Sequence, residues 1–178
     1  MSSARTSSLR PSGRWRLVVS SALFLVFLVV DHVTKALVRA EVAQGPFHAS
    51  FIPGVLDLEF VANRGAAFGM GEGMGWVFVL LAVAVLAFVA LYLSRAPLIS
   101  PFEVVGLGML AGGAVGNAID RVLFGYVCDF FATTFIDFPV FNVADIGITL
   151  GVAVAAIGFI FPSHANAHDD TPGGAACQ

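Results

Sequence analysis

Long apolar stretches interrupted by few polar positions dominate the hydrophobic pattern of this chain. They cover four segments, at residues 17–38, 76–93, 102–121 and 142–161. At about 1.5 Å of rise per residue, helices of this length cross most or all of the hydrocarbon core of a bilayer. The pattern therefore predicts an all-α polytopic membrane protein with four transmembrane helices.

The second and third apolar segments carry further information. Trp76–Leu93 contains no charged residue. In the third segment Gly108, Gly112 and Gly116 recur at every fourth position, so they share one helix face. A face of bare backbone lets a neighbouring helix approach closely. We therefore expect the third helix to be closely packed.

The first apolar segment allows two interpretations. A basic start followed by the 14 largely apolar residues Leu17–Val30 is typical of a cleaved secretory signal. The helical pattern continues past Val30 to Val38, however, and no clear cleavage site with small residues follows. We therefore expect a retained first transmembrane helix.

Alternation with a period of two replaces the helical pattern between residues 45 and 63, as in a half-buried strand. One face of the predicted strand would carry Val55, Asp57, Glu59 and Val61, and the other face would carry Leu56, Leu58, Phe60 and Ala62. Pro46, Pro53 and Gly54 add turn residues. The stretch predicts a small extracytoplasmic β element. Residues 63–69 then fit a short helix or turn at the membrane surface, and the small residues of 65–75 suit a movable lid.

Both ends of the chain differ from the apolar core. Residues 1–16 are Ser-rich with only arginines as charges, and residues 163–178 are polar without periodicity, so we expect two disordered cytoplasmic tails. Five arginines then lie inside the cell, which weakly favours this orientation by the positive-inside rule. Residues 39–75 and 122–141 consequently lie outside, and one multi-pass domain spans 17–162.

Composition supports a membrane protein and excludes other classes. Hydrophobic residues make up 58% of the chain, charged residues 12%, and the mean hydropathy is +0.89. The net charge of −3 and the lack of a basic stripe give no reason to expect nucleic acid as a partner. Cys128 and Cys177 have no metal-ligand spacing and fall on opposite sides of the bilayer, so we expect no disulfide.

Two carboxylates stand out as candidate catalytic groups. Residues 112–130 begin inside an apolar helix that is expected to end near Asp129, and Asp145 opens the next apolar segment. Ionisable groups beside membrane-length apolar runs are costly, which makes them candidates for a functional site. A close pair in a partly dry site shares one proton, so one member can deprotonate water while the other donates. The alternative for Asp145 alone, a helix cap or an interfacial residue, has equal weight.

Further polar residues fall at the same membrane face. Asn117 and Arg121 share a helix face and could orient the two aspartates or bind substrate main chain. The alternative is an Asp120–Arg121 neighbour pair with the arginine extending to the interface. We expect a supporting role for Asp120 rather than catalysis.

Three more candidates have open alternatives. Asp31 and Lys35 share a helix face, where a surface ion pair at the membrane boundary is favoured over a chemical role. Asn63 and Gly65 could present amide groups to a peptide or form a plain turn. Cys128 is expected to be a small buried residue and not a nucleophile. His164 and His168 lie in a polar tail on the other side, so we expect no metal there.

Function could belong to different classes. A membrane protease with an aspartate pair explains the one-sided carboxylates. A small ion-coupled transporter would place polar residues at mid-depth on several helices, and the second apolar segment has none. A structural scaffold leaves the carboxylates unexplained.

Five sequence blocks together resemble the bacterial lipoprotein signal peptidase family (signal peptidase II, aspartyl peptidase family A8). They occur in the family's order between residues 31 and 146: Asp31-His-Val-Thr34-Lys35, Asn63-Arg-Gly65-Ala-Ala-Phe68, Gly112-Gly-Ala-Val-Gly116-Asn117-Ala-Ile-Asp120-Arg121, Gly125-Tyr-Val-Cys128-Asp129-Phe130 and Phe141-Asn142-Val-Ala144-Asp145. A departure is Cys128, which stands at a usually aliphatic position.

The resemblance implies a fold and an activity. It implies four membrane helices, an extracytoplasmic β cradle and a surface helix over the site. It implies a membrane aspartyl endopeptidase of the bacterial cytoplasmic membrane, with its site at the extracytoplasmic face. The substrate would be a diacylglyceryl-modified prolipoprotein, cut immediately before the lipidated cysteine. Membrane lipids would be partners, no metal or other cofactor is expected, and we expect a monomer.

The resemblance also implies residue roles. Asp129 and Asp145 would form the catalytic dyad. The surrounding site would consist of Asp31, Lys35, Asn63, Gly112, Asn117, Arg121, Asn142 and Ala144.

Overall fold

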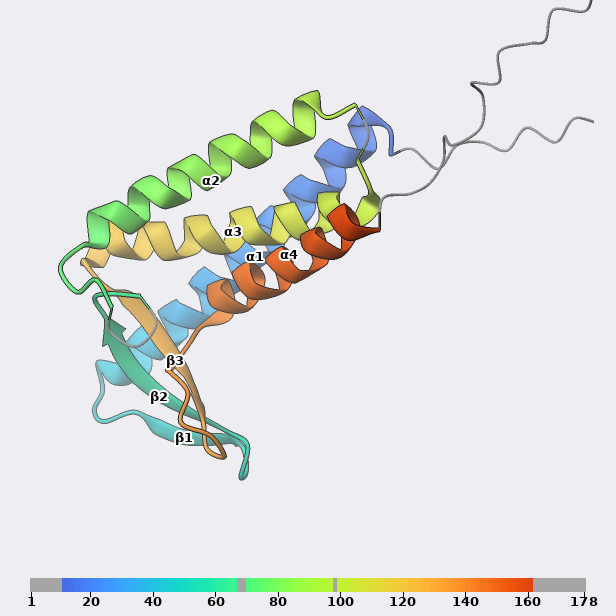
Figure 1. Cartoon of the computed structure of the whole chain (residues 1–178). Coiled ribbons are helices and arrows are strands. Elements are labelled where there is room, and N and C mark those ends of the chain that lie inside the picture. The colour runs from blue at the N-terminus through green and yellow to red at the C-terminus, as the bar shows by residue number, and fades with distance from the viewer. Residues whose placement is uncertain (1–10, 67–69, 98, 162–178) are drawn as a thin grey trace, which may run out of the picture.

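The computed structural model describes residues 11–66, 70–97 and 99–161. Within these residues, four helices form a bundle (Figure 1), each long and apolar enough to cross a membrane. They are α1 (Gly13–Val42), α2 (Gly75–Arg95), α3 (Pro101–Phe124) and α4 (Val143–Ile160). The predicted fold class, four transmembrane helices with a small β element, is confirmed.

Polar side chains determine where several helices begin. Ser12 caps α1, and Ser100 and Asn142 open α3 and α4 in capping boxes with Glu103 and Asp145. Such boxes satisfy backbone N–H groups that have no partner within the helix. The start of α4 is thus defined by two of the predicted site residues.

Close backbone contacts place α3 between α1 and α4. A methyl group added at Gly112 would lie 2.6 Å from the carbonyl oxygen of Phe24 in α1. One added at Gly151 of α4 would lie 2.6 Å from the backbone nitrogen of Leu110 in α3. Glycine is required at such positions because any side chain would force the helices apart. The predicted close packing of α3 is present.

Helix α2 is held more loosely than the others. It packs mainly against α3, and only Ala82 and Val89 of its residues are buried. The Tyr92 hydroxyl donates a hydrogen bond to the Glu103 carboxylate of α3, near the C-terminal end of α2. The Tyr92 ring also lies 5.7 Å from that of Phe159 in α4, centre to centre. Closer to the N-terminal end, side chains of α2, α3 and α4 line a pocket.

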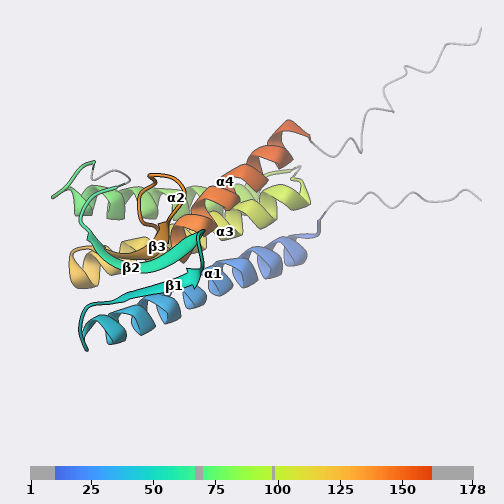
Figure 2. The same cartoon turned by 90° about the horizontal axis from the view of Figure 1, so that it is seen from below.

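An antiparallel sheet lies crosswise at one end of the bundle (Figure 1). Its order is β1 (His48–Ile52), β2 (Leu56–Asn63) and β3 (Val127–Thr133). Cys128 and Phe130 of β3 pack with Val38 of α1 in a small core. Figure 2 shows the strands beside the C-terminal part of α1.

The third strand was not predicted from the sequence. The helix preceding Asp129 ends at Phe124, because Gly125 adopts a left-handed conformation (φ 75°) and terminates α3. The expectation that the helix reaches Asp129 was therefore wrong. Residue 129 lies instead within β3, where it pairs with Val61 of β2.

The stretch expected to hold a surface helix or lid is only partly described. Residues 64–66 and 70–74 form bends and turns, and residues 67–69 lie outside the described residues. Of the two expected tails, residues 1–10 and 163–178 lie outside them as well, whereas residues 13–16 belong to the first turn of α1. His164, His168 and Cys177 also lie outside the described residues.

Candidate active site

Asp129 and Asp145 come together at the end of the bundle from different elements. Asp129 is in the middle of β3 and 2% exposed, and Asp145 is in the first turn of α4. Both line a pocket of about 680 Å³ whose other polar residues include Asn63, Asn117 and Arg121. The remaining lining is mostly apolar and comes from α2, α3, α4 and the β3–α4 connection. The folded chain therefore places two carboxylates at one apolar pocket.

Two side-chain amides hold the Asp129 carboxylate. Asn63 Nδ2 donates to Oδ2 at 2.8 Å and Asn142 Nδ2 donates to Oδ1 at 2.6 Å. Chiefly because of burial, and with a smaller contribution from the charge of nearby Asp145, the pKa of Asp129 is raised to about 7 despite the opposing effect of the two amides. Asp129 thus exchanges a proton near neutral pH.

Asp145 has a different environment. Its Oδ1 accepts a hydrogen bond from Asn117 Nδ2 at 2.7 Å, and its Oδ2 accepts one from the backbone N–H of Asn142 at 3.1 Å. It lies at the N-terminal end of α4, where the helix dipole favours negative charge. The capping alternative is therefore correct for Asp145, and the same carboxylate also lines the pocket.

Lys35 lies behind the pocket and is completely buried. Its Nζ is 2.8 Å from Asp31 Oδ2 and 3.2 Å from Asp120 Oδ2, and it donates to Asn117 Oδ1 at 2.8 Å. An ammonium group has donors only, so the carbonyl oxygen of Asn117 faces Lys35. The amide nitrogen of Asn117 then faces Asp145.

The expectation of a surface ion pair at Asp31 and Lys35 was wrong, because both side chains are 0% exposed. Asp31 Oδ1 accepts the Ala144 N–H at 2.9 Å, which ties α1 to the start of α4. Gly116 is packed so closely that an added methyl group would lie 2.7 Å from Asp31 Oδ2. Helix packing, which the spacing pattern does not reveal, buries the pair.

Asp120 supports the site structurally, at a distance from the pocket. Besides Lys35, it pairs with Arg39 at 3.2 Å and accepts the backbone N–H of Cys128 at 3.1 Å. It thereby ties α3 to α1 and to the strand that carries Asp129. The alternative pairing with its neighbour Arg121 is not formed.

Arg121 extends to the loop that follows β2. It donates to the carbonyl oxygen of Gly65 at 2.9 Å and to that of Asn117 at 3.2 Å. Its guanidinium group lies 4.8 Å from the ring centre of Phe78 in α2. The Gly65 N–H in turn donates to Asn63 Oδ1 at 2.9 Å, which directs the Asn63 amide towards Asp129.

The remaining predicted residues serve close packing or the same network. Gly112 contacts the backbone of α1, and Ala144 is completely buried. Asn142 bridges the site, since its Nδ2 donates both to Asp129 and, at 3.1 Å, to Asn117 Oδ1. Eleven of the twelve predicted residues are joined by hydrogen bonds and ion pairs into one network, and Gly112 lies apart from it against Phe24. Of the twelve, Asp129, Asp145, Asn63, Asn117 and Arg121 line the pocket.

Some residues that contact the site or line the pocket were not predicted from the sequence. Arg39 pairs with Asp120, and its position four residues after Lys35 could have revealed it. The apolar pocket lining, such as Phe78 and Leu81, carries no signal within an apolar helix. Cys128 is buried with a thiol pKa of about 11, mainly because of its burial, so it is no nucleophile at neutral pH. No group of three potential metal ligands occurs among the described residues.

A four-helix membrane bundle with two aspartates at an apolar pocket has the form of a membrane-embedded hydrolase. The family model described as "Signal peptidase (SPase) II" matches residues 23–161. The chain therefore belongs to the signal peptidase II family, whose members are proteases that cleave signal peptides from prolipoproteins. The family expected from the sequence blocks is confirmed.

Individual relatives agree. A lipoprotein signal peptidase of Symbiobacterium thermophilum is 43% identical over 141 residues, which are 77% of this chain and 91% of the relative. A lipoprotein signal peptidase of Streptococcus pyogenes serotype M5 is 36% identical over 142 residues, which are 80% of this chain and 91% of the relative. A solved bacterial membrane enzyme superimposes with a TM-score of 0.76 at 28% identity, covering 87% of this chain and 96% of its own. A second solved bacterial membrane enzyme superimposes with a TM-score of 0.71 at 31% identity, and the match covers 81% of this chain and 94% of that enzyme.

Proposed function

We propose that Asp129 and Asp145 are the catalytic dyad of this signal peptidase and that it cleaves a diacylglyceryl-modified prolipoprotein immediately before the lipidated cysteine. The observation that carries this proposal is their convergence on one pocket. No other Asp or Glu of the described residues lines that pocket. None of the described Lys, Arg or His side chains forms an ion pair with either carboxylate. Both aspartates are thus free to take part in proton transfer.

The different environments of the two carboxylates suggest separate roles. We assign the shared proton to Asp129, whose pKa is raised to about 7, and the role of general base to Asp145 at the N-terminal end of the helix. Asp145 takes a proton from a water molecule, and the oxygen of that water attacks the scissile carbonyl carbon. Asp129 donates its proton to the carbonyl oxygen. As the tetrahedral intermediate collapses, the C–N bond breaks and Asp145 gives the proton that it took from water to the amine nitrogen. Asp129 takes a proton back from one hydroxyl group of the intermediate, so the products are a carboxylic acid and an amine and the dyad returns to its starting protonation state.

The polar neighbours position substrate and dyad. Asn63 and Asn142 hold Asp129, and Asn117 holds Asp145, so both carboxylates keep a fixed orientation. Arg121 borders the same pocket and can bind main-chain carbonyl groups of the substrate. Preorganised groups of this kind need no rearrangement during the reaction.

The apolar part of the pocket suits a lipid-anchored substrate. Phe78, Leu81 and Val85 of α2 face Leu110 of α3 and Ile148 of α4 across it. A substrate held in the membrane by acyl chains diffuses in the bilayer plane and meets a pocket at the end of the bundle. We place this end at the outer leaflet of the cytoplasmic membrane, with both termini in the cytoplasm. We also expect the enzyme to be a monomer.

Cleavage by the purified protein tests the dyad. A diacylglyceryl-modified prolipoprotein is incubated in detergent with the wild type, Asp129→Asn and Asp145→Asn. Asp137→Asn, a substitution of an exposed residue in the β3–α4 connection, serves as the matched control. We expect cleavage by the wild type and the control only. Full activity of either dyad variant would place the chemistry on other residues, and cleavage at another bond would refute the proposed cleavage position.

A further inference from the structure

Exposed apolar side chains gather at the free end of the sheet. They come from the end of β1, the β1–β2 turn and the β3–α4 connection, and we call them the apolar tip: Phe51 (58% exposed), Ile52 (46%), Val55 (44%), Phe135 (64%) and Ile136 (53%). Large apolar residues this exposed and this close together indicate an interaction surface. None of them lines the pocket of the two aspartates.

A hydrogen bond joins the two segments that form the apolar tip. The backbone N–H of Thr134 donates to the carbonyl oxygen of Val55 at 3.1 Å. Within the β3–α4 connection, the Thr133 hydroxyl donates to the carbonyl oxygen of Ile136 at 3.1 Å. The Phe51 ring lies 6.2 Å from that of Phe131, centre to centre. The tip is therefore a continuous surface built by two segments far apart in the sequence.

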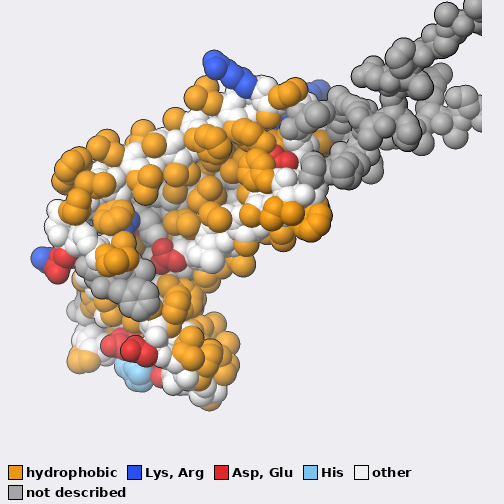
Figure 3. Space-filling model, in the orientation of Figure 1, with side chains coloured by type: hydrophobic (Ala, Val, Ile, Leu, Met, Phe, Trp, Pro, Cys, Tyr) orange, Lys and Arg blue, Asp and Glu red, His pale blue; other side chains and the backbone are white. Residues whose placement is uncertain are grey.

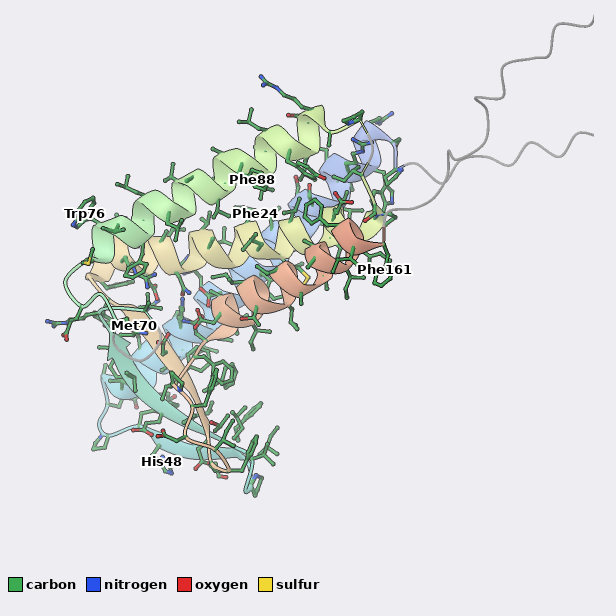
Figure 4. All side chains as sticks on the ribbon, in the orientation of Figure 1. Phe24, His48, Met70, Trp76, Phe88 and Phe161 are labelled. Carbon is green, nitrogen blue, oxygen red and sulfur yellow. The ribbon has the colours of Figure 1, made fainter. Side chains whose placement is uncertain are left out.

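Polar side chains occupy another part of the same sheet. His48 and Glu59 are direct neighbours across β1 and β2, and His48 Nε2 is 3.8 Å from Asp57. Figure 4 shows His48 pointing away from the helices. In Figure 3 acidic side chains and a histidine lie at the lower left of the sheet, and hydrophobic side chains gather at its lower right. The free end of the sheet is thus amphipathic.

The position of the sheet relative to the bundle identifies the partner. The four helices span the bilayer, and the sheet lies crosswise at their end and projects past α4 (Figure 1). Its free end therefore lies over lipid beside the bundle and not over protein. The apolar side meets the corner between sheet and helices in Figure 3, next to the apolar outer face of α4. The apolar tip thus continues the lipid-facing surface of the bundle.

We propose that the apolar tip inserts into the interfacial layer of the adjacent lipid leaflet. Phenylalanine and aliphatic side chains of interfacial segments lie at the boundary between headgroups and acyl chains, which is the depth we assign to the tip. The sheet is then held at both ends, by the bundle at one and by lipid at the other. This holds β3, and with it Asp129, at a constant depth relative to a membrane-anchored substrate.

Fluorescence quenching tests the insertion directly. The full chain with Cys177→Ser receives one new cysteine, either Ile52→Cys or Phe135→Cys in the tip, or His48→Cys or Glu59→Cys as matched controls on the polar side. Cys128 stays, because its buried thiol with a pKa of about 11 resists labelling, and the Cys177→Ser parent verifies this. Each protein carries an environment-sensitive fluorophore and sits in nanodiscs with one copy per disc.

Nitroxide groups on the lipid acyl chains should quench the tip labels about threefold more strongly than the control labels, and aqueous iodide should show the reverse preference. Equal quenching at both positions would overturn the proposal. Shielding of the tip that arises only with two copies per disc would overturn it in favour of a protein dimer. These readings do not depend on catalysis, so they stand apart from the test of the dyad.

An activity measurement tests the consequence for the enzyme. The double variant Ile52→Ser/Phe135→Ser should lose roughly tenfold in kcat/KM towards a lipidated substrate in vesicles, because two large apolar side chains no longer enter the lipid. Its activity in detergent should equal that of the wild type, which also shows that it folds. Unchanged activity in vesicles would contradict the role of the tip in positioning Asp129.

Discussion

Two pairs of aspartates lie close together in this protein and have opposite properties. Asp31 and Asp120 are enclosed by helices and neutralised by Lys35 and Arg39. Asp129 and Asp145 have amide partners but no ion pair, and they border a pocket. A carboxylate that forms ion pairs holds helices together, whereas one without an ion pair beside a pocket is available for proton transfer. The neighbours, and not the residue type, distinguish the structural pair from the candidate catalytic pair.

The largest effect is expected for the dyad. Asp129→Asn and Asp145→Asn should each reduce cleavage by roughly 10³-fold or more, because a general acid or base typically contributes about 10²–10⁴. Thermal unfolding in detergent should change little. Asp137→Asn should retain full activity. A variant of either dyad residue with more than a tenth of the wild-type rate would contradict the comparison.

The structural pair should respond through stability. Lys35→Met removes the ammonium group that pairs with the buried carboxylates of Asp31 and Asp120. This loss should lower the free energy of unfolding by about 3–5 kcal/mol. Denaturation in detergent, followed by circular dichroism, measures this loss. The double variant Lys35→Met/Asp120→Asn should recover part of it, because one uncompensated charge is removed. An unchanged midpoint for Lys35→Met would show that the ion pairs do not stabilise the fold.

Asn117 connects the two pairs, since it accepts from Lys35 and donates to Asp145. Asn117→Ala should lower kcat by roughly 10²-fold, the order expected for losing one preorganised donor. The change in KM should be smaller. A steady-state comparison with the wild type separates the two parameters, and an effect confined to KM would assign Asn117 to substrate binding instead.

The pH dependence of both kcat/KM and the free energy of unfolding should reveal the titration of Asp129, which has no ion-pair partner among the described residues. As general acid it must be protonated, so kcat/KM should fall as the pH rises through about 7. Because burial raises its pKa above the unfolded value of 3.8, the folded state binds more protons between pH 3.8 and about 7. Asp129 therefore lowers stability progressively as the pH rises through that window.

Unfolding measurements across that range, on the wild type and Asp129→Asn, test the second effect. The variant lacks the titrating group, so its stability should fall less steeply with rising pH. Identical slopes for the two proteins would contradict a raised pKa in the folded state.

The smallest effect concerns Cys128, whose side chain packs away from both pairs. Cys128→Val conserves an apolar group of similar size, so the free energy of unfolding should change by less than about 1.5 kcal/mol. Cleavage should be unaffected. Thiol reagents should modify the wild-type residue only after denaturation. Rapid modification of the folded protein would show that this strand opens.

Much of this protein follows from its sequence alone. Four apolar segments of membrane length predicted the four helices, because length and hydropathy decide membrane insertion. The period of two between residues 45 and 63 predicted a β element, which forms β1 and β2. The order and content of the polar blocks identified the family and, with it, both aspartates of the proposed dyad.

Only the tertiary structure decided the rest. The strand carrying Asp129 forms because its residues pair with β2, a long-range contact that no local pattern announces. The pattern that suggested a surface ion pair at Asp31 and Lys35 could not show that α3 and α4 bury it, since burial depends on glycine contacts between distant segments. Spacing places polar groups on one helix face, but their partners and their access to the pocket come from the packing of the helices.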